Sequence, residues 1–256
     1  MSLPPGRTIA LSPARKYMCD MLRASRKIPL VAVERHCRLG EVVAARDRLA
    51  ARPSWFALFL KGWALVSARR PELRRAYLSF PWPRLHEHAC NVASLAVARR
   101  VGDEDAVMSL QIRHPEQRSL ADIDDLIRRS RTDPVERFGD FRRARRLGRM
   151  PWPLRRFFWW LGLEVSGRLR LQNAGTFGVT GVAALGSASL HLLSPLTTTI
   201  TFGVFAADGT VPVRLFYDHR VLDGVQPAEA LRDLEDTLCG PIREEVAGGA
   251  PRVVAA

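Results

Sequence analysis

The amino-acid sequence predicts a single domain of mixed α+β type. Two pairs of strand-like runs, 91–99 with 106–113 and 197–206 with 210–217, each enclose residues typical of a β-hairpin turn. Segments with helical spacing of apolar residues lie between and after these pairs. No internal repeat and no Pro/Ser-rich linker divides the 256 residues, and 47% of them are hydrophobic, which is enough to build a sizeable core.

The N-terminal half supplies an arm, a strand and several helices. Residues 1–26 are basic and contain several prolines, so we expect a partly ordered arm there. The apolar run 28–33 predicts a strand, and 41–51 predicts a helix after it. Residues 55–70 are apolar on nearly all sides, which predicts a buried helix that ends before a proline and is shorter than the ~20 residues of a membrane span.

A capping pattern marks the next helix. Ser119 and Asp122 have the serine-x-x-acid spacing that caps a helix N-terminus, and arginines follow in the last turn, where positive charge suits the helix dipole. We therefore expect a helix from Ser119 to about Arg131.

Residues 132–174 combine many arginines with large aromatic residues. This mixture occurs in nucleic-acid-binding segments, but no recognition helix, zinc finger or aromatic strand motif accompanies it, and nucleic acid is not the expected partner. It also suits an interfacial helix on an anionic membrane, through 142–162. A third interpretation is a helix whose aromatic face packs on its own domain or on a neighbouring subunit.

The net charge bears on the same question. The chain has 39 lysines and arginines against 26 acidic residues, giving a formal charge of +13, and almost all of the cations are arginine. Such a surface favours anionic partners, among them nucleic acid, an acidic carrier protein, phosphorylated cofactors or anionic lipid.

The C-terminal part places a histidine between a strand and a helix. The strand 210–217 leads directly into Asp218-His219-Arg220-Val221-Leu222-Asp223-Gly224. A leucine stripe after Pro227 then predicts a helix, and 240–256 is expected to be a flexible tail. This arrangement indicates that the backbone fixes the position of the His219 imidazole, as a general base requires.

The cysteines carry no metal or redox pattern. The four cysteines are Cys19, Cys37, Cys90 and Cys239. Their spacings match neither a metal site nor a redox pair, and no secretory signal precedes them. We expect reduced thiols, no metal, and a cytoplasmic protein or one bound at the inner face of the membrane.

The string from Asp218 to Gly224 closely resembles the signature of the catalytic acyltransferase component of 2-oxo acid dehydrogenase complexes, the dihydrolipoamide acyltransferases. Other runs resemble landmarks of that family in the same order: Ile28-Pro29, Ala68 to Leu73, Asn91-Val92, Ser119 to Ile123, and Gly175-Thr176-Phe177. The resemblance implies a catalytic domain over 27–239 with the chloramphenicol acetyltransferase-like fold, a two-layer sandwich of a mixed sheet and helices.

The same resemblance implies acyl transfer from a thioester. His219 matches the family's general base, and Asp223 matches a second acidic position that mainly fixes the local structure, often through an ion pair. Thr180 falls where the family has a serine whose hydroxyl stabilises the tetrahedral oxyanion, although Gly181 replaces the asparagine that follows it; a plain strand threonine is the alternative. The family's sites lie between the subunits of a trimer, so a homotrimer or larger assembly is expected.

Departures from the family define the expected function more narrowly. None of Lys16, Lys27 and Lys61 stands in a lipoyl-attachment context, Leu30 replaces a frequent histidine, and 132–174 is an insertion. We therefore expect a stand-alone acyltransferase without a covalently attached lipoyl group. Its donor would be a thioester of coenzyme A or of an acyl carrier protein. The alternative is a non-catalytic trimeric scaffold or binding module.

Overall fold

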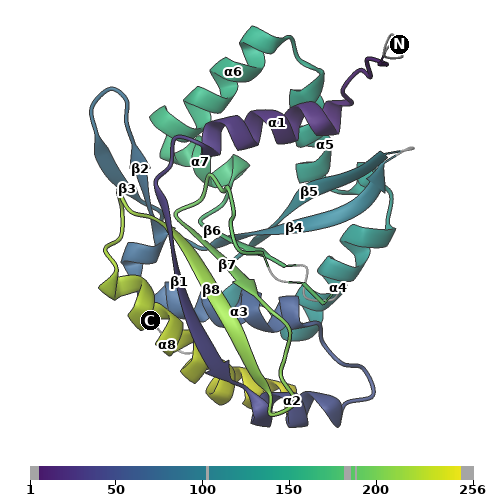
Figure 1. Ribbon diagram of the computed structural model, residues 1–256, viewed down its shortest axis with the longest axis vertical. Helices are drawn as coiled ribbons and strands as arrows, with labels where there is room; N and C mark the ends of the chain where they lie inside the picture. Colours follow the sequence, from purple (N-terminus) through teal and green to yellow (C-terminus); the bar gives the residue numbers. More distant parts are fainter. Residues whose placement is uncertain (1–5, 102–103, 182–185, 188, 249–256) are drawn as a thin grey trace, which may run out of the picture.

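A six-stranded mixed sheet forms the centre of the computed structural model, which describes residues 6–101, 104–181, 186–187 and 189–248 (Figure 1). The strand order is β1-β8-β7-β6-β4-β5, and β6 runs parallel to both of its neighbours while the other pairs are antiparallel. The strands are β1 (Leu30–Arg38), β4 (Val92–Val101), β5 (Glu104–Arg113), β6 (Phe177–Thr180), β7 (Thr198–Phe202) and β8 (Thr210–Asp218). A separate hairpin, β2 (Arg75–Leu78) with β3 (Arg84–Glu87), projects from the side of the molecule. The α+β prediction is confirmed.

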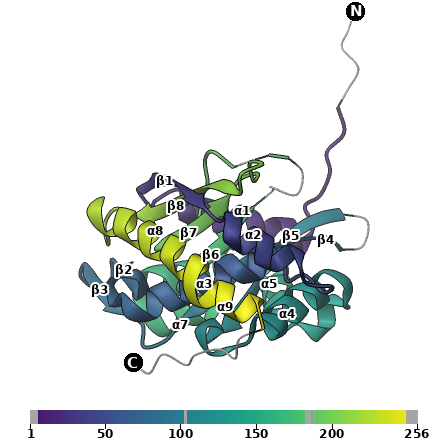
Figure 2. The same ribbon diagram turned by 90° about the horizontal axis from the view of Figure 1, so that it is seen from below.

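One face of the sheet is covered by a layer of helices. This layer contains α3 (Trp55–Arg69), α4 (Leu120–Thr132) and α8 (Val225–Thr237), with α2 (Gly40–Asp47) beside them (Figure 2). The main hydrophobic core lies between this layer and the sheet, because alternate strand residues such as Leu95, Val179 and Leu215 point toward buried Phe59 and Trp63.

Local sequence signals explain where several of these elements begin. The Ser119 hydroxyl accepts a hydrogen bond from the Asp122 N–H at 3.1 Å, which confirms the predicted cap of α4. Ser54 caps α3 in the same way, through the Ala57 N–H. Gly209 has a φ of +81° in the turn before β8, and a Cβ there would lie 2.5 Å from the Gly40 Cα, so only glycine fits.

Both predicted hairpins are present. β4 pairs antiparallel with β5, and β7 with β8. The turn residues Gly102 and Asp103, named in the first hairpin, lie outside the described residues.

The N-terminal segment differs from the expected partly ordered arm. Residues 13–25 form helix α1 (Pro13–Ser25), capped by Ser12 and started by a proline, and it packs on α5, α6 and β5 (Figure 1). Asp20 forms a largely buried ion pair with Arg155 at 2.7 Å. The prolines and basic residues suggested an arm, but Tyr17 and Met21 repeat at the i, i+4 spacing that gives a helix one apolar face.

The segment 132–174 folds into α5 (Gly139–Arg149), α6 (Trp152–Trp160), a single π-turn (Leu161–Val165) and α7 (Gly167–Asn173). These helices gather around α1 at the β5 side of the sheet (Figure 1). Gly148 is in contact with α1, since a Cβ there would overlap the Pro13 carbonyl oxygen at 2.0 Å. One face of this segment therefore packs on the chain's own domain, but most of its aromatic side chains are exposed, namely Trp152, Phe157, Phe158 and Trp160.

The C-terminal segment also differs from expectation, because residues 240–246 are not a loose tail. A π-turn (Leu238–Ile242) leads into α9 (Arg243–Val246), and Ile242 and Val246 are buried. Glu245 accepts from the Leu120 N–H at 2.8 Å and pairs with Lys61, which is only 3% exposed. Nothing local in the sequence reveals that a core lysine on α3 needs this partner. Residues 249–256 of the expected tail lie outside the described residues.

Candidate active site

His219 lies one residue beyond β8, where the chain turns away from the sheet. Its backbone N–H donates to the Pro29 carbonyl at 3.1 Å, which ties the turn to the start of β1. The N–H groups of Val221 and Leu222 donate to the Asp218 carbonyl, so residues 218–222 form a compact turn. The imidazole is 49% exposed, and its ring centroid lies 5.7 Å from that of Tyr217. The turn thus presents an accessible imidazole on a fixed backbone.

A buried carboxylate holds this turn together. The Asp218 side chain is 0% exposed, and it accepts from the backbone N–H of Arg220 at 3.0 Å and from its Nε and Nη2 at 2.9 and 2.7 Å. Such a bidentate pair fixes geometry as well as charge. Burial alone would lower the pKa of Arg220, but its hydrogen bonds to Asp218 raise that pKa above the ordinary value. The guanidinium also stacks 4.4 Å from the Tyr77 ring of β2.

Arg170 of α7 reaches the same region from the predicted insertion. It is 3% exposed and donates to three backbone carbonyls, those of Tyr77, Leu163 and Pro195, at 3.1, 3.0 and 2.8 Å. Burial lowers the pKa of Arg170 to about 10, and the neighbouring Asp218 carboxylate opposes that lowering. The insertion therefore contributes a buried cation beside the carboxylate that fixes the histidine turn.

Asp223 does not make the structural ion pair expected at its position. Its side chain is 90% exposed, and the Nδ1 of His219 lies 3.9 Å from its Oδ1. The backbone N–H of Asp223 donates to the Gln226 side chain at 3.0 Å. Within one chain, the local ion pair is formed by Asp218 and Arg220 instead.

Thr180 and His219 of one chain are not brought together. Thr180 pairs with Thr201 across β6 and β7, and Thr201 pairs with Arg214 of β8, five positions before His219. At about 3.3 Å per residue and about 4.8 Å per strand, the two residues lie on the order of 20 Å apart.

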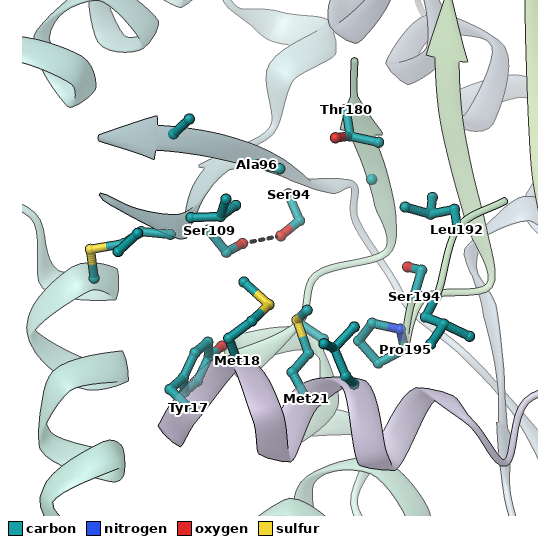
Figure 3. Close-up of a pocket in the computed structure, with 18 of the residues that line it drawn as sticks. Tyr17, Met18, Met21, Ser94, Ala96, Ser109, Thr180, Leu192, Ser194 and Pro195 are labelled. Carbon is teal, nitrogen blue, oxygen red and sulfur yellow. Dashed lines mark hydrogen bonds between the residues drawn. The ribbon is translucent and has the colours of Figure 1, made fainter. Parts of the chain in front are cut away.

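Thr180 instead lines a large cavity on the sheet face opposite the main core. The cavity has a volume of about 870 Å³ and lies between α1 and strands β4, β5 and β6. Figure 3 shows Met18 and Met21 of α1 on one side, Ser94 and Ala96 of β4 on the other, and Thr180 at the end of β6. Ser94 and Ser109 share a hydrogen bond at its floor.

Only part of this arrangement can be recognised from sequence patterns. The alternation along β4 is one available signal, because small Ser94, Ala96 and Ala98 alternate with the core residues Leu95 and Val97. Asp218 belongs to the recognised string, but no local feature distinguishes it from Asp223 as the buried carboxylate. Arg170 gives no signal, since its partners are backbone carbonyls far away in the sequence.

The described residues contain no cluster of three or more His, Cys, Asp or Glu side chains able to hold a metal ion. His86 and His88 are two positions apart, so alternation in a strand places them on the same side, and their ring centroids lie 4.9 Å apart. His88 is buried, and burial is the first cause that lowers its pKa to about 4, with further lowering by His86.

The structural role of the Asp218 carboxylate can be tested by measuring the free energy of unfolding of the protein. Asp218→Asn removes the charge that pairs with Arg220 and faces buried Arg170, so we expect it to lower the free energy of unfolding by about 3–5 kcal/mol. Asp223→Asn is the matched control and should change it by less than about 0.5 kcal/mol, because that side chain is exposed. Urea denaturation measures both, and equal midpoints for Asp218→Asn and the wild type would contradict the assignment.

Comparisons with known proteins give matches at the level of structure alone. No protein-family model matches the chain, and no curated protein is similar to it in sequence. The probable dihydrolipoamide acetyltransferase of Listeria monocytogenes is 19% identical, with a TM-score of 0.64 over 98% of both chains. The dihydrolipoamide acetyltransferase of Azotobacter vinelandii is 18% identical, with a TM-score of 0.67 over 96% of this chain and 99% of that one.

A chloramphenicol acetyltransferase is also similar, at 13% identity and a TM-score of 0.51, over 86% of this chain and 94% of that one. These likenesses span almost the whole chain but at low identity, so they establish the architecture. The chain has the chloramphenicol acetyltransferase-like fold, in the form found in the catalytic cores of dihydrolipoamide acetyltransferases.

Proposed function

We propose that the chain is an acyltransferase that moves an acyl group from a thioester to a hydroxyl, amine or thiol acceptor. The donor would be carried by coenzyme A or by an acidic acyl carrier protein. The observation that carries the proposal is the accessible His219 imidazole on a turn fixed by buried Asp218. Similar folds in dihydrolipoamide acetyltransferases and chloramphenicol acetyltransferase support it.

In this mechanism His219 is the general base. Its imidazole takes the proton of the acceptor X–H, and X attacks the thioester carbonyl carbon to give a tetrahedral oxyanion. When the carbon–sulfur bond breaks, the thiolate leaves and receives the proton from the imidazolium. A base of this kind contributes about 10²–10⁴ in rate. Asp223 lies on the Nδ1 side of the ring, which leaves Nε2 for the acceptor. In the Azotobacter enzyme, a histidine and an asparagine examined for roles in catalysis are likewise four residues apart.

We propose that the oxyanion is stabilised by Thr180 of a second subunit. Within one chain the distance to His219 is too long for both residues to act on one carbonyl, whereas the family resemblance implies sites between subunits of a trimer. The Thr180 hydroxyl makes no side-chain hydrogen bond with any residue in the described ranges, so it is available as a donor. Loss of one such donor costs about 3 kcal/mol in comparable sites.

A thioester assay with His219→Ala tests the proposed function. The purified protein is mixed with acetyl, octanoyl and palmitoyl coenzyme A and a panel of simple acceptors, and release of the free thiol is followed. We expect His219→Ala to lower the rate by about 10²–10⁴-fold. His36→Ala, which changes an exposed histidine of β1, should keep the wild-type rate. If wild type and His219→Ala are equally inactive with every donor, the non-catalytic scaffold becomes the better account.

We also propose that α6 and the β2–β3 hairpin rest on an anionic membrane. Phe80, Phe157, Phe158 and Trp160 are exposed and joined by ring contacts of 5.2 to 6.0 Å; we call them the aromatic patch. Exposed Trp152 with Arg156 stacked on it extends α6 at its other end. Aromatic rings suit the headgroup boundary, and arginines suit lipid phosphate. Within the described residues no helix is long and apolar enough to cross a bilayer.

Vesicle flotation tests the aromatic patch. We expect the wild type to float with vesicles containing anionic phosphatidylglycerol, less so as salt is added. The double variant Phe157→Ser, Trp160→Ser should remain at the bottom of the gradient. The control Val225→Ser, which changes an exposed apolar residue of α8, should float like the wild type. A wild type that never floats would exclude this use of the patch and favour subunit packing.

A further inference from the structure

We infer that the 870 Å³ cavity between α1 and the sheet binds a long unbranched acyl chain, with its carbonyl carbon beside Thr180. The identity of the head as a thioester rests on the proposed function, whereas binding of the hydrocarbon chain does not. The cavity is roofed by Met18, Met21 and Leu22 of α1 and floored by Ala96 and Ala98 of β4.

Four hydroxyl groups on the walls of this cavity, those of Ser94, Ser109, Thr199 and Ser194, are paired with one another. Ser94 bonds to Ser109, and the Thr199 hydroxyl donates to the Ser194 oxygen at 2.8 Å. Ser194 also accepts from the Leu196 N–H at 3.2 Å. A ligand that buried its own polar groups here would lose their hydrogen bonds to water without replacement. The surface left for contact is therefore mainly carbon, which suits an aliphatic chain.

The shape and the side chains favour a chain that is long and flexible. If each methylene takes roughly the 30 Å³ of a liquid water, about 16 carbons need on the order of 500 Å³, which this cavity exceeds. Three methionines line it, Met18, Met21 and Met108. Unbranched thioether side chains adapt their packing to ligands of varied shape.

The cavity continues toward the segment 132–174. A second cavity of about 230 Å³ lies beside it, and both are lined by Tyr17, Ser109, Trp159, Asn173 and Ala174. Tyr17 of α1 and Trp159 of α6 stand at this boundary with ring centroids 5.3 Å apart. Arg15, Arg100 and Asp105 also line the first cavity, so its wall is charged there. The uncharged boundary at Trp159, next to the second cavity, is therefore the place expected for the methyl end of the chain.

The Thr180 side is the suitable place for the carbonyl. Thr180 lies next to Thr201 in register, and Thr201 is 2% exposed with a hydroxyl that has no partner among the described residues. Thr201 is not itself part of the cavity wall, but Thr180 is. A hydroxyl without a side-chain partner can bind a polar head, while the carbon surface of the cavity binds a hydrocarbon tail.

Displacement of a fluorescent fatty acid tests this inference without relying on turnover. The probe is cis-parinaric acid, bound to the full chain and displaced by palmitoyl, octanoyl or acetyl coenzyme A. We expect the probe to bind, palmitoyl coenzyme A to displace it at low concentration, and acetyl coenzyme A to fail. Monopalmitoylglycerol serves as a lipid acceptor with the same chain; displacement by it but not by palmitoyl coenzyme A would overturn the assignment to the acyl donor.

Two cavity-filling variants and a matched control make the test specific. Ala96 and Ala98 of β4 line the cavity. The variants Ala96→Trp and Ala98→Phe fill part of it, and each should weaken probe binding by about tenfold or more. Ala32→Trp changes an exposed alanine of β1 outside the cavity and should bind like the wild type. Wild-type affinity in both cavity variants, with folded circular-dichroism spectra, would overturn the inference.

The outcome is separable from that of the proposed function. Tight binding of palmitoyl coenzyme A by a protein without any transferase activity would support the cavity and oppose the enzyme. Turnover of acetyl coenzyme A with no binding of the longer chain would do the reverse.

Discussion

The buried Asp218 carboxylate is the constraint on which the candidate site depends. A carboxylate with no exposed surface must be paired, and here Arg220 pairs with it while Arg170 lies close by. Arg220 stacks on Tyr77, and Arg170 donates to the carbonyls of Tyr77 and Pro195. The Asp218–Arg220 pair thus links the end of β8 to β2, and Arg170 beside it links α7 to β2 and to the loop before β7. His219 owes its fixed position to these contacts.

The two faces of the sheet differ, because one packs against the main core and the other lines the large cavity. Residues such as Leu95 and Val97 face the helices α3 and α4 in the main core, while Ser94, Ala96 and Ala98 of the same strand leave space on the other face. Helix α1 covers that space without filling it. A single strand can do both because its side chains alternate between faces.

Elements defined by local patterns were predictable from the sequence, and those defined by distant contacts were not. The Ser119 cap, the β7–β8 hairpin and helix α3 follow from residues within a few positions of each other. Helices α1 and α9 are held in place by partners far away in the sequence. Asp20 of α1 pairs with Arg155, and Glu245 of α9 pairs with Lys61. In the candidate site, the histidine could be named, but the choice of Asp218 over Asp223 as the buried carboxylate needs the tertiary structure.

The central claim is a site shared between subunits, and complementation of inactive variants tests it most directly. His219→Ala and Thr180→Val chains would be co-expressed with different affinity tags, and mixed oligomers purified through both tags. In a cyclic trimer every mixed composition has one site with an intact His219 and an intact Thr180, so we predict about one third of wild-type transferase activity from two variants that are each nearly inactive. Mixed oligomers no more active than the separate variants would contradict the account.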